Sequence, residues 1–174
     1  MSYEEYLQRK DKSIQLSKYF NEWEFIHSKS NLKYYKLDNR MDCNQKVNAS
    51  NLCVNYLDGI RSFIGHPVYI SSGYRCHDLN KAIGGHPNSY HTQGLAADIL
   101  CPSLSLQKLA STIVHLISKK LIYYPDQLIY YPHQGFIHFG IRENRFMHRR
   151  QVFEYTRDGE YKLIKEWAGR NTNV

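Results

Sequence analysis

The chain has 174 residues, a hydrophobic content of 42% and a formal net charge of +7 at pH 7. This length suits one domain with a single core and argues against two. No apolar run is long enough for a membrane helix, and none near the N-terminus resembles a secretion signal, so we expect a soluble protein made in the cytoplasm. The positive charge suits contact with anionic polymers, either nucleic acids or phosphate-rich cell-wall polymers.

The first part of the chain is mainly polar. Residues 1–13 are expected to be held loosely, and residues 14–174 to form the domain. Asn21 is a suitable N-cap for a short helix over residues 22–27. The stretch 28–45 shows little periodicity, which predicts a surface loop.

Two longer helices are predicted where apolar residues recur at helical spacing. The first covers residues 47–64 and ends at Gly65, and the second begins at the capping residue Ser103 and continues to about Lys120. The apolar positions are Leu52, Tyr56, Ile60 and Phe63 in the first helix, and Leu106, Leu109, Ile113 and Leu116 or Ile117 in the second.

Short runs of β-branched and aromatic residues predict strands between and after these helices. The last two strands are separated by Asp158-Gly159, which is typical of a hairpin turn. This order of elements predicts an α+β domain with a largely antiparallel sheet and helices packed on it. The predicted strands cover residues 67–71, 95–100, 126–131, 135–141, 151–155 and 161–164.

Three residues of zinc-binding types stand in and after the central part of the chain. His91 and Asp98 are seven residues apart, and His138 lies in a later predicted strand. Two imidazoles and a carboxylate form a ligand set that zinc accepts with its fourth position open for water, which favours hydrolysis. The spacing predicts one ligand on a loop and the next on the following strand. Alternation then places Phe136, His138 and Gly140 on one face of the later strand.

Residues 71–98 contain Ser-Gly-Tyr-Arg, Leu-Asn, Gly-Gly and Ser-x-His-x-x-Gly-x-Ala-x-Asp, followed by Phe-Ile-His at 136–138. This arrangement resembles the M15 metallopeptidases, the group of D-alanyl-D-alanine carboxypeptidases and phage endolysins. The likeness extends over residues 16–141 and is greatest to the small phage- and prophage-borne branch. It implies a hedgehog- or D,D-peptidase-like fold and one Zn²⁺ per chain, with His91, Asp98 and His138 as ligands.

The resemblance also suggests which groups move protons. Many family members carry an acidic residue three positions before the last ligand, where this chain has Gly135. One branch instead has a histidine five positions before that ligand, and His133 matches it. His133 is therefore a candidate for proton transfer or oxyanion stabilisation. Asp126 is a second candidate, although a carboxylate at a strand end can equally orient a zinc-bound histidine.

Two further residues are candidates for contact with substrate. An arginine sixteen residues before the first ligand, here Arg75, is associated in the family with gripping a substrate carboxylate or polarising the scissile carbonyl. A guanidinium suits both tasks, but it can also pin its own loop through hydrogen bonds. Ser89 can orient the ligand loop or touch substrate.

The resemblance implies a zinc peptidase that hydrolyses stem peptides of bacterial peptidoglycan, during phage lysis or wall penetration. A monomer is expected, and another component would have to carry it to the wall. The alternative is a catalytically silent zinc domain that binds wall peptides or a protein partner, as in the hedgehog signalling domain. Nucleic-acid binding rests only on the basic residues after position 141 and lacks a base-reading motif, so it is not expected.

Overall fold

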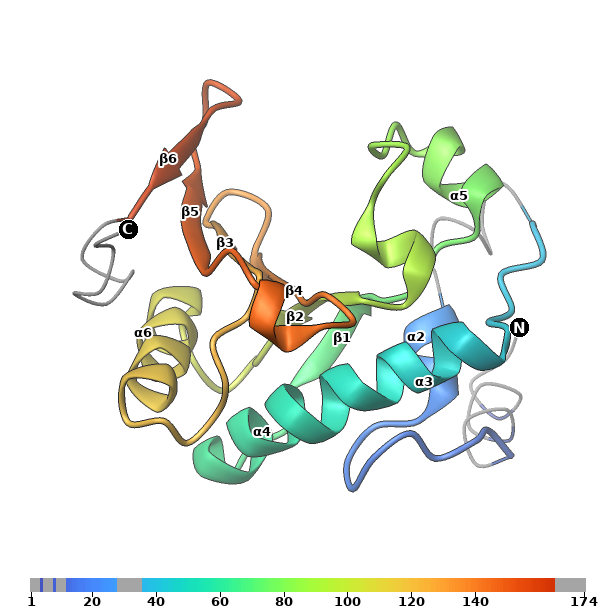
Figure 1. Cartoon of the computed structure of the whole chain (residues 1–174), viewed down its shortest axis with the longest axis horizontal. Helices are drawn as coiled ribbons and strands as arrows, with labels where there is room; N and C mark the ends of the chain where they lie inside the picture. The colour runs from blue at the N-terminus through green and yellow to red at the C-terminus, as the bar shows by residue number, and fades with distance from the viewer. Residues whose placement is uncertain (1–3, 5–7, 9–11, 28–35, 165–174) are drawn as a thin grey trace.

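The structure is a computed structural model that describes residues 4, 8, 12–27 and 36–164. These residues form one α+β domain (Figure 1). Most of the segment 1–13, and with it the prediction of loose attachment, lies outside the described residues. None of the described helices is long and apolar enough to cross a lipid bilayer.

Within the described residues, six strands form one sheet in the order β1-β2-β4-β3-β5-β6. All neighbouring strands are antiparallel except β3 and β5, which run parallel. The predicted mainly antiparallel sheet is therefore confirmed, and each predicted strand is found to within two residues. The strands are β1 (Tyr69–Ser72), β2 (Ala96–Leu100), β3 (Gln127–Tyr131), β4 (Phe136–Gly140), β5 (Gln151–Tyr155) and β6 (Tyr161–Leu163).

The first long helix is confirmed, but it begins four residues before the predicted start. Asp42 caps it by accepting a hydrogen bond from the backbone of Gln45, whose side chain bonds back to Asp42. The end of the predicted loop 28–45 is therefore helical, while residues 28–35 lie outside the described part. Gly65 ends the helix in a left-handed conformation with φ of 70°. The segments are α3 (Cys43–Leu52), a π-helical turn (Cys53–Leu57) and α4 (Asp58–Ile64).

The π-helical turn explains one wrong prediction about this helix. A π turn holds more residues than an α turn, so positions after it are rotated relative to an unbroken α-helix. Ile60 is fully buried, whereas Phe63 is 54% exposed instead of sharing the apolar face.

The remaining helices are short, except for α6. Asn21 caps α2 (Glu22–Ile26) as predicted, with a reciprocal bond to Glu24. The helix α6 (Leu106–Ser118) is capped by Ser105 and not by Ser103, because the Ser105 side chain accepts from the backbone of Lys108. Three further elements of the described residues were not predicted: α5 (His77–Ala82) and the 3₁₀ helices η3 (Tyr90–Gln93) and η4 (Arg145–Met147).

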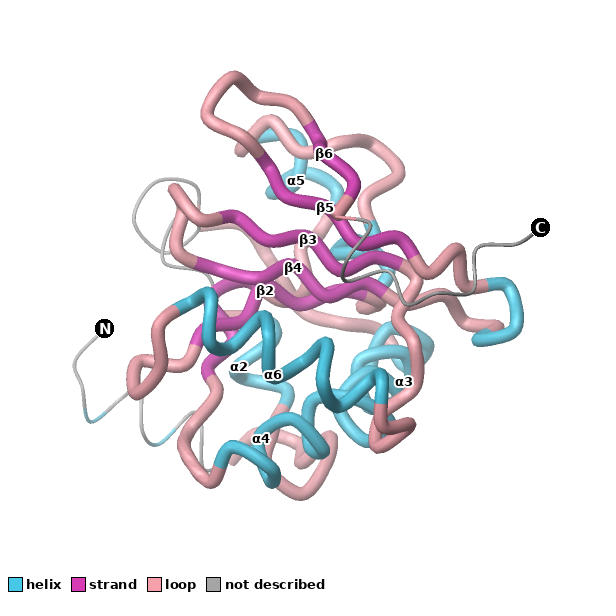
Figure 2. The backbone as a smooth tube through the Cα atoms, turned by 90° about the vertical axis from the view of Figure 1, so that its left-hand side faces the viewer, coloured by secondary structure: helices cyan, strands magenta, loops and turns pink. Residues whose placement is uncertain are grey.

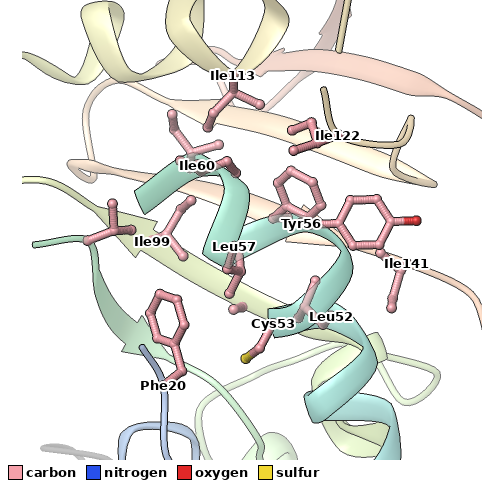
Figure 3. Packing of buried hydrophobic residues seen from close by; sticks show 14 of the residues in the cluster. Phe20, Leu52, Cys53, Tyr56, Leu57, Ile60, Ile99, Ile113, Ile122 and Ile141 are labelled. Atoms are coloured by element: carbon pink, nitrogen blue, oxygen red, sulfur yellow. The ribbon is translucent and has the colours of Figure 1, made fainter. Parts of the chain in front are cut away.

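The core lies on one face of the sheet. Figure 2 shows α2, α3, α4 and α6 on this side, and Figure 3 shows Ile60 of α4 and Ile113 of α6 in one cluster with Ile99 of β2. Ile99 of β2 and Ile137 and Phe139 of β4 are fully buried there, against Leu57 and Ile60 of the long helix. Because side chains alternate along a strand, the residues between these positions point to the other face. On that side, α5 and the β5–β6 hairpin rise at opposite ends of the sheet (Figure 1).

Candidate metal centre

The face of the sheet opposite the core brings the three predicted ligand residues together. Asp98 and His138 are direct partners in the antiparallel β2–β4 ladder, so their side chains lie side by side. His91 comes from η3, which precedes β2 and turns into it at Gly94. Donor atoms of the three residues lie within 4.8 Å of one another.

Two of the three separations between the donor atoms match those of ligand atoms around a zinc ion, and the third is shorter. Asp98 Oδ1 is 2.8 Å from His138 Nδ1 and 3.3 Å from His91 Nε2, and the two nitrogens are 3.3 Å apart. Zinc bonds of about 2.0–2.1 Å in a tetrahedron separate ligand atoms by roughly 3.3 Å. His91 and Asp98 are buried, whereas His138 is partly exposed, so the site opens beside His138. The residues fit zinc with an open fourth position.

Hydrogen bonds hold two of these side chains in the orientation that a metal needs. The Nδ1–H of His91 donates to the carbonyl oxygen of Gly73 at 2.6 Å, which leaves Nε2 free of a proton. The second oxygen of Asp98, Oδ2, accepts from Arg75 Nη2 at 2.9 Å. Arg75 Nε in turn donates to Ser72 Oγ at 2.9 Å. Asp98 therefore presents Oδ1 alone to the metal position.

Electrostatic interactions keep the candidate ligands in metal-binding protonation states. Burial acts to raise the pKa of Asp98, but the neighbouring His91 and His138 lower the pKa well below its usual range. Burial also lowers the pKa of His91 and outweighs the attraction of Asp98, which favours the neutral imidazole. A carboxylate and a neutral imidazole are the forms that coordinate zinc.

Two glycines give the ligands room. A side chain at Gly73 would come within 2.6 Å of the Phe25 backbone, so only glycine lets this carbonyl reach His91. A Cβ at Gly140 would lie 3.1 Å from the Tyr90 ring and 3.2 Å from His138 Nε2. His138 and Gly140 share one face of the strand, as predicted, and the lack of a side chain at Gly140 leaves space for the imidazole.

Asp126 lies in a separate buried network. Its Oδ1 is 2.9 Å from Arg142 Nε, and its Oδ2 is 2.6 Å from Arg149 Nη2 and accepts from Tyr90 Oη at 3.0 Å. Burial opposes ionisation, but hydrogen bonds from Arg149 and Tyr90 hold the pKa of Asp126 below its usual value. These contacts favour a structural role for Asp126, as the anchor of the tyrosine that precedes His91, over the catalytic role predicted from the sequence.

His133 lies in the tight turn between β3 and β4 and is exposed. Its Nδ1 accepts a hydrogen bond from Arg157 Nε at 3.3 Å. The same turn contains Gly135 with φ of 81°, a conformation that other residues adopt only with strain. The turn geometry accounts for glycine at the position where many M15-like sequences have an acid.

Arg75 and Ser89 both lie next to the ligands. Arg75 is bound to Asp98 and Ser72, which supports the role of a loop pin. Ser89 stands at the N-cap position of η3 without a side-chain capping bond, and its backbone carbonyl oxygen accepts from the Thr92 hydroxyl at 2.7 Å, which supports the turn that carries His91.

A family model described as Peptidase M15 matches residues 24–140, more than half of the chain. The chain belongs to the peptidase M15 family. This membership implies a zinc-dependent metallopeptidase, and the matched region contains all three candidate ligands with Arg75, Ser89 and His133. No curated protein shows a significant match to the chain.

Residues other than the predicted ones also contribute to the surroundings of this M15 centre. Sequence reasoning did not single out Tyr90, Tyr131, Arg149 or Arg157. Tyr90 is adjacent to His91, and this position could have identified it from the sequence. The others meet the site only through strand pairing. Tyr131 does so through the antiparallel β3–β4 ladder, and Arg149 and Arg157 because β5 joins β3 in parallel.

We expect His138→Ala to reduce bound zinc from about one ion per chain to a small fraction, because two protein ligands seldom retain the metal. Elemental analysis of protein purified without chelator measures this. His77→Ala, which removes an exposed histidine near the motif, is the matched control and should keep full occupancy. Full occupancy in His138→Ala would show that the ligands are wrong.

Replacing Arg75 separates its two roles. Lysine keeps the charge but cannot bond to Ser72 and Asp98 together in the same planar arrangement, so Arg75→Lys should weaken zinc binding about tenfold to a hundredfold. Competition with a chelator gives the affinity, and Arg40→Lys, an exposed surface arginine, is the control. Unchanged zinc affinity and melting temperature with lost peptidase activity would instead identify Arg75 as a substrate clamp.

Proposed function

We propose that the protein hydrolyses peptide bonds in the stem peptides of bacterial peptidoglycan, with one zinc ion held by His91, Asp98 and His138. The observation that carries the proposal is the tetrahedral spacing of these donor atoms in a member of the peptidase M15 family. The bond would be that of a D,D-carboxypeptidase or an endopeptidase.

The protein groups around the site have distinct tasks in this proposal. When bound, zinc supplies Lewis-acid chemistry that activates water and polarises a carbonyl group. Arg75 holds Asp98 in its one-oxygen orientation, and the Gly73 carbonyl fixes the tautomer of His91. The partly exposed side of His138 is where a peptide can approach.

His133 is the proposed proton-handling group. Because Arg157 donates to its Nδ1, the neutral ring carries its proton on Nε2. In this tautomer His133 can donate a hydrogen bond from Nε2 to the developing oxyanion. Transfer of a proton to the leaving amine requires the doubly protonated ring, which forms when Nδ1 is released from Arg157 and takes up a proton. Asp126 is less suited, because both of its oxygens are already bound by arginines.

A catalytically silent zinc domain that binds wall peptides is the second candidate. The observation in its favour is Gly135, which has a positive φ and stands three residues before His138, so that this position carries no acidic side chain. The basic residues after position 141 give less support to binding of anionic polymers, because Arg142 and Arg149 are engaged with Asp126. Action during phage lysis or wall penetration, with delivery by another component, remains part of the proposal.

Digestion of purified peptidoglycan separates the two candidates. The zinc-loaded protein should release soluble fragments whose masses, measured by mass spectrometry, identify the bond that is cut. His138→Ala serves as the inactive control. Binding of the protein to sedimented peptidoglycan without release of any fragment would support the silent domain and contradict the peptidase.

We expect His133→Ala to lower turnover roughly a hundredfold with zinc content unchanged, which is the usual contribution of an acid–base group. Asp126→Asn should instead lower the melting temperature, because it leaves Arg142 and Arg149 without their buried anion. Rates and melting curves on both variants measure this. A normal rate for His133→Ala would exclude His133 from proton handling.

A further inference from the structure

An aromatic cluster lies on the sheet face that carries the candidate metal ligands. We call Tyr131, Phe136, Tyr155 and Tyr161 the tyrosine wall. The Tyr131 ring centroid is 4.7 Å from that of Phe136 and 5.0 Å from that of Tyr155. The Tyr155 and Tyr161 centroids are also 5.0 Å apart. The rings form a continuous row from β4 across β3 and β5 to β6.

Strand register places one end of this wall beside the metal centre. In the β3–β4 ladder, Ile129 is paired with His138 and Tyr131 with Phe136. Tyr131 and His138 are therefore diagonal neighbours on one face, a separation of about 7–8 Å that aromatic side chains bridge. Tyr131 also interacts electrostatically with Asp98 and with Arg75. The wall begins within one side-chain length of the ligands.

The wall has unused hydrogen-bonding capacity. The hydroxyl oxygens of Tyr131 and Tyr161 are 3.1 Å apart and exposed to solvent. Burial, together with the Tyr161 hydroxyl and the charge of Asp98, raises the pKa of Tyr131, so its phenol stays protonated at neutral pH. One hydroxyl donates a hydrogen bond to the other, which leaves one O–H donor and several lone pairs for a ligand.

Half of the wall belongs to the β5–β6 hairpin, which follows the region matched by the M15 model. Tyr155 and Tyr161 lie beyond residue 140, and Tyr161 is 56% exposed. The hairpin thus brings an aromatic surface to the site from a part of the chain to which the comparison assigns no role.

We propose that the tyrosine wall binds the substrate peptide next to the scissile bond, with its rings against short apolar side chains and the Tyr131–Tyr161 hydroxyl pair bonded to the peptide backbone. The inference rests on the proposed peptidase function. A peptide is the expected occupant, because groups one side-chain length from a hydrolytic centre meet the residues that flank the cleaved bond. Uncharged rings and hydroxyls suit backbone amides and methyl groups.

The test is calorimetric titration of the zinc-loaded 174-residue chain with a phosphinate pseudopeptide that has two D-alanine-like side chains. Its affinity does not depend on turnover. Tyr131→Phe and Tyr161→Phe keep the rings but remove one hydroxyl each, so each should weaken binding about tenfold, with zinc content and melting temperature unchanged. The double variant should bind no more than about threefold more weakly than either single one, because the two hydroxyls act together.

Tyr123→Phe is the matched control, because Tyr123 is exposed and contacts Arg145 on a different part of the surface. If both wall variants bind the pseudopeptide with unchanged affinity, and the wild-type chain binds it and cleaves peptidoglycan, the proposed role of the tyrosine wall is overturned and the proposed function is not. The proposed role of the wall would also be overturned if a peptide-free glycan fragment competed with the pseudopeptide at these residues and a stem peptide did not. A wild-type chain that neither binds the pseudopeptide nor cleaves peptidoglycan would overturn the proposed function as well.

Discussion

The antiparallel pairing of β2 with β4 is the constraint on which the metal centre depends, because it sets Asp98 directly opposite His138. A slip of one residue would turn one of them into the core. The neighbours of these two residues along the strands hold the register, because Ile99, Ile137 and Phe139 are fully buried on the other face. Each such side chain contributes about 1.5–3 kcal/mol through burial, so the hydrophobic core fixes the ligand geometry.

Contacts from distant parts of the chain then complete the centre. Arg75 holds the outer oxygen of Asp98, and the buried Asp126 joins Tyr90 to Arg149. The Asp126 network links the start of β3, the segment before β5 and the 3₁₀ helix η3 that carries His91. The parallel β3–β5 pairing makes this possible and also brings Arg157 to His133. The C-terminal hairpin is therefore part of the surroundings of the site, although it lies outside the family match.

Local patterns were enough to predict all six described strands, the long helix and the three residues that the structure brings together at the centre. Two of the three residues, His91 and Asp98, are only seven positions apart, and alternation along a strand decides which side chains share a face. The π-helical turn that exposes Phe63 and the choice of Ser105 as the cap of α6 depend on small local energies that periodicity does not resolve. The arginine partners of Asp126 could not be foreseen, because they arise from strand order between residues far apart in sequence.

Anomalous diffraction at the zinc absorption edge, from crystals of protein purified without added chelator, tests the central claim most directly. The structure predicts one peak per chain at about 2.0–2.2 Å from His91 Nε2, Asp98 Oδ1 and His138 Nδ1. Arg75 should remain bonded to Asp98 Oδ2. A zinc peak bound by other residues, or a chain without zinc at these three atoms, would contradict the account.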